Sequence, residues 1–413
     1  MDLETIRGLE ERLKEIAVSV LNQCTRTITI PDVGEIQIVV PSGDMKYPSF
    51  WIRDSVMMAE SGLLSAEFIL EWLRFIARFG QSGENTISLQ HELSVPAWSI
   101  ADHINFDGKP VFFPGTYESG MDQGKGDFGF YPPHDNAYYF VELAYLYYQS
   151  TESTDFLKES IAGVNLMDRL VMAFQAHHVD PTTSLCYSEF PANLVDWGFC
   201  DQIHKSGYLL YPSLLRFRAA DRLAQLAKAQ GDLQQAEAYL AIAVQIRTQI
   251  NRIFYRLDGL YVSATTAGCQ QDIWATAFAI WLGIPDLNRE KTCTLRLLEL
   301  YRNGNGISHG YIRHLPEDGN LFWDRTICPR GEYQNGGYWA TPLGWFTYAL
   351  FKQDQELAGK LIVEWLDHTK QHEENGAPYE WMTKDGSVID GKKYGTSAAL
   401  PYCGWKRIAA EMD

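Results

Sequence analysis

The sequence predicts an all-α protein built as a closed toroid of helical hairpins, with a small β-hairpin near the N-terminus. Apolar residues recur at helical spacing along the whole chain of 413 residues. Long loops rich in glycine and aromatic residues separate these patterns, which predicts one face built from loops. An open helical solenoid is the rival architecture. It ranks second because no repeat of fixed length is visible.

The helical patterns predict roughly a dozen helices. The clearest pair is 207–230 and 233–255, which turns at Gly231-Asp232, a helix stop followed by an N-cap. The predicted helices lie near residues 3–22, 54–80, 91–104, 135–150, 155–177, 207–230, 233–255, 270–283, 288–302, 337–352, 355–372 and 395–411. The one good strand pattern is RTITIPDVGEIQIVV (26–40), which predicts the β-hairpin.

Five connecting segments are expected to be long loops: 40–54, 105–134, 179–206, 303–336 and 373–394. Their many Trp, Tyr and Phe residues argue against disorder, so a functional role is expected. No linker or composition shift divides the chain. We therefore expect residues 1–413 to form a single domain.

The amino-acid composition limits the kinds of partner that we expect the protein to bind. The net charge of −17 disfavours nucleic acid and anionic membranes, because both would repel the protein. No segment has about 18 consecutive apolar residues, and the N-terminus has an amphipathic pattern rather than that of a signal peptide. The seven cysteines are scattered without metal-ligand spacing, which indicates a reducing, cytoplasmic compartment. A homo-oligomer remains an open alternative.

The first candidate motif is YPSFWIRDSVMMAESG (47–62). Asp54 could accept from sugar hydroxyls, Arg53 could donate to them, and Trp51 could pack on a pyranose C–H face. The alternative is structural: Asp54 caps the following helix and Arg53 pairs with a surface acid.

The second motif is YESGMDQG (117–124). In an aromatic pocket, the pKa of Asp122 would rise, and the acid could then protonate a leaving oxygen. Tyr117, Glu118 and Gln123 are substrate-binding candidates beside it. The alternative is a turn with solvated acids. Asp135, which follows a Pro-Pro turn, is expected to cap a helix.

Two further motifs lie near the C-terminus. RGEYQNGGYWATPLGWFTYAL (330–350) places Glu332, Asn335, Tyr338 and Trp339 before a helix, as sugar-site residues or as a buried aromatic cluster. Glu380, between Tyr379 and Trp381, is a candidate for the carboxylate that activates water, or else an exposed acid in a hairpin.

The segment VDWGFCDQIHKSG (195–207) adds Asp196 and Trp197 as binding candidates, with Asp201, His204 and His309 as further residues that could line a site. His204 and His309 lack metal-ligand spacing, so no metal is expected. Motifs for nucleotide binding, serine hydrolysis and zinc proteolysis are missing from the sequence. Paired carboxylates among aromatic residues suit glycosidic bond cleavage.

These segments resemble the (α/α)6-barrel, or six-hairpin, glycosidases. Residues 51–55 (WIRDS) are similar to the W-x-R-D-S segment of glucoamylases. Residues 118–122 (ESGMD) and 135–138 (DNAY) resemble segments of trehalases and of the processing glucosidase and mannosylglycerate hydrolase family. Residues 333–339 (YQNGGYW) resemble the Y-P-N-G-W segment of the same families. The segment DWGFCDQ is also similar to rhamnosidase-like barrels.

The resemblance implies a barrel of six helical hairpins and an inverting hydrolase of a small α-linked glucoside or mannoside, with no cofactor. It implies Asp122 as general acid, Glu380 as general base with Glu332 in reserve, and Arg53 and Asp54 as sugar ligands. Inversion requires the two carboxyl groups to lie about 6.5–9.5 Å apart. The alternatives are an N-acyl-hexosamine epimerase, which would need a histidine pair, a lyase, and a non-catalytic carbohydrate-binding helical protein.

Overall fold

The computed structural model describes residues 1–31, 33–124, 128–189, 200–317 and 322–413, and these residues are rich in helix. The α-helices are α1 (Leu3–Cys24), α2 (Ile52–Ala59), α3 (Ala66–Phe75), α4 (Asp135–Thr151), α5 (Leu166–Gln175), α6 (Leu210–Ala229), α7 (Leu233–Ile253), α8 (Ile273–Trp281), α9 (Leu287–Arg302), α10 (Leu343–Phe351), α11 (Gln355–Gln371) and α12 (Gly395–Met412).

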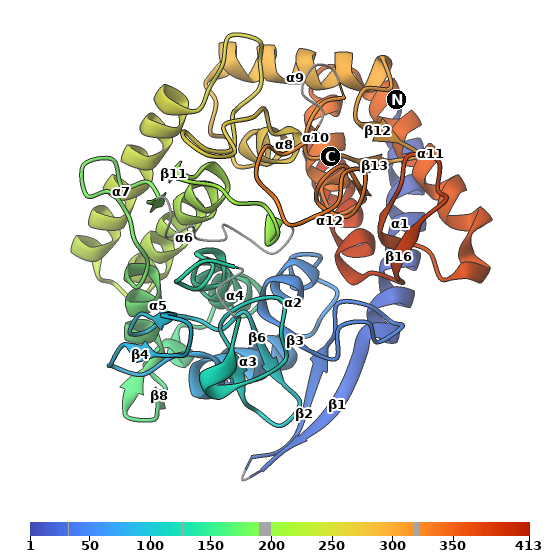
Figure 1. The fold of residues 1–413 in the computed structure, drawn as a ribbon. Helices are drawn as coiled ribbons and strands as arrows, with labels where there is room; N and C mark the ends of the chain where they lie inside the picture. Colours follow the sequence, from blue (N-terminus) through green and yellow to red (C-terminus); the bar gives the residue numbers. More distant parts are fainter. Residues whose placement is uncertain (32, 125–127, 190–199, 318–321) are drawn as a thin grey trace.

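Figure 1 shows the odd-numbered helices on the outside and the even-numbered helices towards the middle. The even-numbered helices contact one another in a cycle: α2 with α4, α4 with α6, α6 with α8, α8 with α10, α10 with α12, and α12 with α2. Each outer helix packs on inner neighbours, as α7 does on α6 and α1 on α12.

The pattern of apolar residues in each helix explains whether it lies among the inner or the outer helices. All eight residues of α2 are buried, and α8 is buried from Ile273 to Ile280, as expected of helices enclosed on every side. In α7 a single stripe at helical spacing is buried: Ala236, Tyr239, Ala243, Ile246 and Ile250. A helix with one apolar stripe is stable on the outside, where its polar face meets water.

Side-chain caps fix several helix starts. Asp232 accepts a hydrogen bond from the backbone N–H of Gln235, so the predicted turn between α6 and α7 is confirmed. The residues Asp2, Ser65, Asn165, Asp272, Asp286 and Asp354 cap α1, α3, α5, α8, α9 and α11 in the same way.

The predicted hairpin is confirmed as β1 (Thr25–Ile30) and β2 (Gly34–Val39), paired antiparallel with Thr25 opposite Val39. The prediction of an all-α protein is too narrow, however. An antiparallel sheet of five short strands joins β12 (Ile307–Ser308), β13 (Tyr311–Ile312), β14 (Tyr338–Trp339), β15 (Tyr379–Met382) and β16 (Ile389–Lys392).

Smaller sheets give regular structure to other segments between the helices. A three-stranded sheet pairs β6 (His103–Asn105) with both β3 (Ser49–Trp51) and β7 (Pro110–Val111). Three two-stranded sheets are β4 (Ile87–Ser88) with β5 (Ser94–Val95), β8 (Ser160–Ile161) with β9 (Val164–Asn165), and β10 (Tyr187–Ser188) with β11 (Gly207–Tyr208).

Four helix predictions are wrong, one entirely and three in part. The predicted helix 337–352 is regular only from Leu343, after β14. The segment 91–104 contains short strands and turns, because Pro96 lacks a backbone donor and apolar residues there reach the core from an irregular chain. The predicted helix 54–80 is two helices, since Ser65 caps α3 as a new helix. The predicted helix 155–177 is regular only from Leu166, after the β8–β9 hairpin.

The first and last helices pack together. The indole Nε1 of Trp405 in α12 donates to the carbonyl of Ile6 in α1 over 2.9 Å. The contact between α12 and α10 depends on two glycines, since a Cβ at Gly404 would lie 2.4 Å from the carbonyl oxygen of Gly344.

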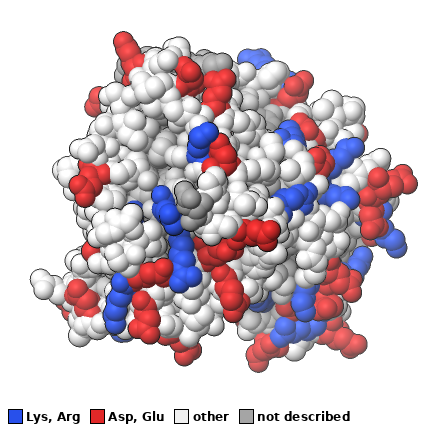
Figure 2. Space-filling view, turned by 90° about the horizontal axis from the view of Figure 1, so that it is seen from below, with Lys and Arg blue, Asp and Glu red and all other residues white. Residues whose placement is uncertain are grey.

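Acidic and basic side chains are interspersed on the face shown in Figure 2, although the net charge is −17. The helices of the described residues include none that combines the length and the apolar character needed to cross a bilayer.

Candidate active site

A cavity of about 430 Å³ is lined by segments that are distant in the sequence: 41–54, 115–117, 201–202, 328–333 and 380–394. Among the described residues, five carboxyl groups line it, from Asp54, Asp201, Glu332, Glu380 and Asp390, together with the cations Lys46 and Arg53. Aromatic side chains complete the wall: Tyr47, Trp51, Tyr117, Tyr333, Trp381 and Tyr394.

Glu380 projects from β15 and is only 1% exposed. The hydroxyl of Tyr47 lies 2.7 Å from each carboxyl oxygen, and the ammonium of Lys46 lies 3.0 Å from Oε2. Burial raises the pKa of Glu380 to about 7, while Lys46 and Tyr47 oppose that rise by stabilising the charged form. This carboxyl group therefore has the donors that a carboxylate needs.

Asp201 lies in the same cavity and is 8% exposed. Its Oδ1 accepts a hydrogen bond of 2.5 Å from the side-chain amide of Gln334. Burial raises the pKa of Asp201 to about 8, which Arg53 and Gln334 oppose and the charges of Asp102 and Glu380 reinforce. Asp201 is therefore mainly protonated at neutral pH.

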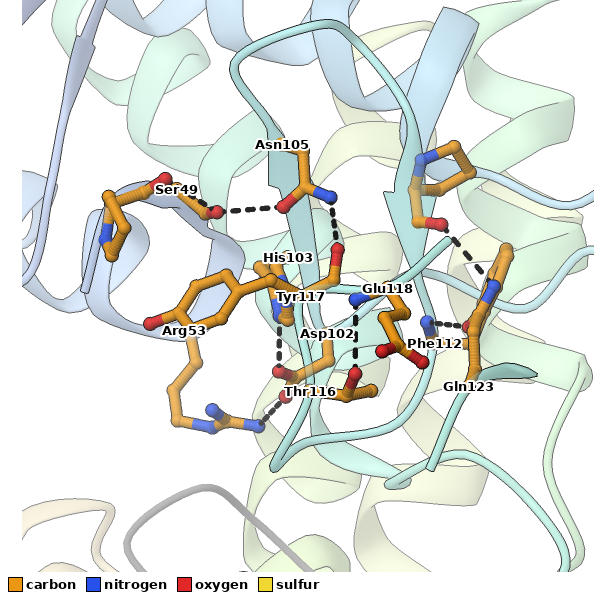
Figure 3. A network of polar contacts seen from close by, with 12 residues as sticks. Ser49, Arg53, Asp102, His103, Asn105, Phe112, Thr116, Tyr117, Glu118 and Gln123 are labelled. Atoms are coloured by element: carbon orange, nitrogen blue, oxygen red, sulfur yellow. Dashed lines mark hydrogen bonds and ion pairs between the residues drawn. The ribbon is translucent and has the colours of Figure 1, made fainter. Parts of the chain in front are cut away.

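Arg53 is held between two buried carboxylates, of which Figure 3 shows Asp102. Its Nη2 lies 2.9 Å from Asp102 Oδ1, and its Nε lies 2.6 Å from Asp135 Oδ2. The predicted capping role of Asp135 is wrong, because it lies inside α4 and His134 occupies the N-cap position. Arg53 is thus anchored by Asp102 and Asp135 at the cavity wall.

The same network supports Trp51. Asp102 Oδ2 lies 2.9 Å from His103 Nδ1, and the His103 ring stacks on Trp51 at 4.3 Å between centroids. The Tyr117 ring lies edge-on to Trp51 at 6.2 Å. These contacts fix an aromatic wall suited to a sugar C–H face.

Asp54 is a third buried carboxyl group of the cavity, 3% exposed. It accepts a hydrogen bond of 2.8 Å from the Tyr394 hydroxyl. Burial raises the pKa of Asp54 to about 6, against the opposing charge of Arg53. It is therefore mainly ionised at neutral pH and able to accept from a hydroxyl group.

The cavity brings together six of the residues predicted for the site: Trp51, Arg53, Asp54, Tyr117, Glu332 and Glu380. Asp201, named in the sequence among further candidates, also lies there. Glu332 is exposed at the rim, whereas Glu380 is buried. No histidine is found among the described residues of the lining, so the histidine pair of the epimerase alternative is not assembled there.

The ESGMD segment is placed differently from its prediction. Asp122 and Glu118 are exposed and do not line the cavity, because residues 120–122 form a short 3-10 turn at the surface. Gln123 is buried, but its amide oxygen accepts a hydrogen bond from the backbone N–H of Phe112 (Figure 3). Its amide nitrogen donates to the backbone carbonyl of Gly120, so the side chain stabilises the loop.

Three predicted site residues of the segment 330–350, Asn335, Tyr338 and Trp339, have structural contacts instead. The Asn335 side chain accepts from the backbone of Trp323 and donates to that of Cys328. Tyr338 donates to Glu317, and Trp339 is fully buried against Trp274. The remaining predicted site residues, Asp196 and Trp197, lie outside the described residues.

Several lining residues were missed by the sequence analysis, among them Lys46, Tyr47, Trp381, Asp390 and Tyr394. Some of them could have been found from their closeness in the sequence to predicted site residues. Lys46 and Tyr47 precede Trp51 by a few residues, and Trp381 follows Glu380. Asp390 gives no such signal, because it reaches the site only through the pairing of β16 with β15.

Solved glycosidase structures are similar to nearly the whole chain. A GH63 mannosylglycerate hydrolase from Thermus thermophilus in complex with glucose has a TM-score of 0.59 at 16% identity, covering 95% of this chain and 99% of that chain. The same hydrolase with Tris and D-glycerate has a TM-score of 0.61 at 15% identity, covering 95% and 99%.

A GH78 rhamnosidase of Bacillus sp. GL1 has a TM-score of 0.57 at 13% identity, covering 96% of this chain and 34% of that much longer chain. No protein-family model and no curated protein sequence matches this chain. At these identities the similarity concerns the fold, and the expected resemblance is confirmed at that level. The chain therefore has the fold of the six-hairpin glycosidases.

Proposed function

We propose that this protein is an inverting glycoside hydrolase that cleaves a small α-linked glucoside or mannoside. The observation that carries the proposal is the pair Asp201 and Glu380, two buried carboxyl groups in one cavity with different partners. We also propose that the cycle of inner helices is an (α/α)6 barrel, which is supported by the contacts from α2 round to α12.

The partners of the two carboxyl groups support opposite roles. Asp201 has an amide partner and a pKa near 8, so it holds a proton at neutral pH and acts as the general acid. Glu380 has Lys46 and two contacts from Tyr47, which favour its ionised form, so it acts as the general base. The acid role that the sequence predicted for Asp122 passes to Asp201, since Asp122 is exposed outside the cavity.

The proposed reaction is one displacement. Asp201 donates its proton to the glycosidic oxygen as the bond from C1 to that oxygen breaks. A water molecule attacks C1 from the opposite face, and Glu380 takes one proton from that water. The products are the free aglycone and a sugar of inverted anomeric configuration. Trp51 and Tyr117 pack on the sugar, and Asp54 accepts from a hydroxyl group.

The size and charge of the cavity support a short, uncharged substrate. Its volume of about 430 Å³ lies in the lower part of the usual range for small-molecule sites. The two cations that line it in the described part of the chain are already engaged by carboxylates, Arg53 by Asp102 and Asp135, and Lys46 by Glu380 and Asp390.

The test is proton NMR of the protein with a panel of α- and β-linked glucosides and mannosides, read before the released sugar mutarotates. We expect the β-anomer to appear first from an α-linked substrate. Asp201→Asn and Glu380→Gln should each lower kcat by about 10²–10⁴-fold. Asp122→Asn is the matched control and should retain activity. Loss of activity in Asp122→Asn with activity kept in Asp201→Asn would return the acid role to the loop at 118–122.

A further inference from the structure

We infer that Lys46 is a positioning residue for Glu380, and that Asp390 on the neighbouring strand moderates the effect of the Lys46 charge. The inference deepens the proposed function and rests on it for its catalytic meaning. Its physical content, an ion pair that governs one buried carboxyl group, can be measured without any substrate.

The Lys46 ammonium lies between two carboxylates, those of Glu380 and Asp390. Lys46 Nζ lies 3.0 Å from Glu380 Oε2 and 2.5 Å from Asp390 Oδ2. Side-chain exposure increases from 1% at Glu380 to 29% at Lys46 and 45% at Asp390. The contact to Glu380 is therefore shielded from water, whereas Asp390 faces the solvent at the rim.

The backbone fixes Lys46 at this place. The loop that carries it is fastened to the chain after β16, since Gly43 N–H donates to the Lys393 carbonyl and Gly395 N–H donates to the Pro41 carbonyl. Asp44 adds a second connection between the loop and β16, because its carboxylate accepts hydrogen bonds from the backbone N–H groups of Lys46 and Lys392. Lys46 thus arrives on an ordered loop.

Other titratable groups face Glu380 from every side of the cavity. Tyr47 shares the loop with Lys46, Asp390 comes from β16, and Asp201 lines the same cavity. The hydroxyl groups of Tyr117, Tyr333 and Tyr394 also interact electrostatically with Glu380. Among the described residues, Lys46 is the one cation within ion-pair distance of Glu380.

These charges predict shifts of opposite sign. Removing the Lys46 charge leaves a buried carboxylate without its counter-ion, so Glu380 should protonate at higher pH, by about 1 pH unit or more. Removing the Asp390 charge takes away a negative neighbour, so Glu380 should protonate at lower pH. Arginine at position 46 keeps the charge and should restore most of the wild-type behaviour.

The experiment is a pH titration of glutamate carboxyl groups by ¹³C NMR, on protein labelled at glutamate Cδ. The Glu380 signal is the one that disappears in Glu380→Gln. We expect its midpoint to rise in Lys46→Met, to fall in Asp390→Asn and to stay near wild type in Lys46→Arg. Lys384→Met is the matched control, because it removes one positive charge from an exposed site on the turn after β15.

Activity supplies the second measurement. The acidic limb of the kcat/KM profile should move in the same directions as the NMR midpoints. A Glu380 midpoint in Lys46→Met that matches wild type, or that moves equally in Lys384→Met, would overturn the inference. The expected midpoints without cleavage of any glycoside would support the ion-pair inference and count against the hydrolase proposal alone.

Discussion

Asp201 is a buried acid that should reduce the stability of the protein. The unfolded chain ionises this group near its ordinary pKa of 3.8, whereas the folded protein keeps it protonated up to about pH 8. Its contribution is fully present below pH 4 and is lost as the pH rises to 8. Asp201→Asn should therefore raise the free energy of unfolding at pH 8 by at least about 2 kcal/mol, with little change at pH 4.

Urea unfolding at the two pH values measures this effect. Asp122→Asn removes an equal charge from the surface and serves as control. An equal change at both pH values in Asp201→Asn would contradict the pH-dependent explanation. A more stable protein with lower activity would fit the usual cost of a functional buried acid.

Tyr47 gives a second prediction for a single side chain. Its hydroxyl group contacts both oxygens of Glu380, and hydrogen bonds to charged groups are worth about 1.5–3 kcal/mol. Tyr47→Phe should lower kcat by about 10–100-fold while the fold stays intact. Steady-state kinetics beside circular dichroism would test this. Tyr208→Phe, which loses a hydrogen bond to Asp180 outside the cavity, should keep full activity.

The hairpin of β15 and β16 contains a glycine, Gly391, that lies close to the Glu380 side chain. Gly391 has φ of +60°, and a Cβ there would lie 2.4 Å from the Cβ of Glu380. Gly391→Ala should displace Glu380 and lower kcat by about tenfold or more, by analogy with small misplacements of catalytic groups. Gly386→Ala is a matched control, because Gly386 has a similar φ of +68° and no atom within 4 Å of the added Cβ.

Kinetics and thermal unfolding of the two variants separate the effects. Both substitutions strain a left-handed backbone, so both should lower Tm, and Gly391→Ala should lower it further because its Cβ also clashes with Glu380. Only Gly391→Ala should lower activity. Equal activity in the two variants would mean that the close approach of β16 does not position Glu380.

Local patterns predicted the regular elements well. The buried stripe of α7, the turn at Asp232 and the β1–β2 hairpin follow from short-range periodicity and capping. The five-stranded sheet could not be predicted in this way. Its strands have two to four residues, and its pairs join Ile312 to Trp339 and Trp339 to Trp381 across long stretches of chain.

The site was predictable to the same extent. The segment around Trp51 and Asp54 lies at the start of an inner helix, α2, and lines the cavity. A local pattern at a helix start was therefore enough to predict this part of the site. Asp122 and Asp201 both lie in aromatic loops, and nothing local distinguishes the buried acid from the exposed one. Burial of Asp201 depends on Gln334, which is 133 positions away in the sequence.

For the whole molecule, buried histidines set the response to acid. His134 and His177 lie with their rings 5.1 Å apart, and burial lowers the pKa of both, that of His177 to about 3. The unfolded chain takes up protons near the ordinary pKa of 6.5, so this contribution is present above 6.5 and is lost as the pH falls towards 3. Each neutral histidine should cost about 2 kcal/mol of stability by pH 5.

His177→Gln should reduce the slope of unfolding free energy against pH between 6.5 and 4. Denaturant titrations at several pH values would measure that slope. His91→Gln, at an exposed position away from the buried histidines, is the matched control and should leave the slope unchanged. A slope in His177→Gln equal to that of wild type would exclude His177 as a source of acid sensitivity.

The packing of α1 on α12 has a consequence for synthesis on the ribosome. The buried face of α1, which includes Ile6, Leu9 and Leu13, is covered by a helix that is translated almost four hundred residues later. Until then the nascent chain exposes an apolar surface that has no local partner. Such late, long-range contacts slow folding and favour aggregation. We expect the growing chain to depend on a chaperone that shields α1 until α12 has emerged.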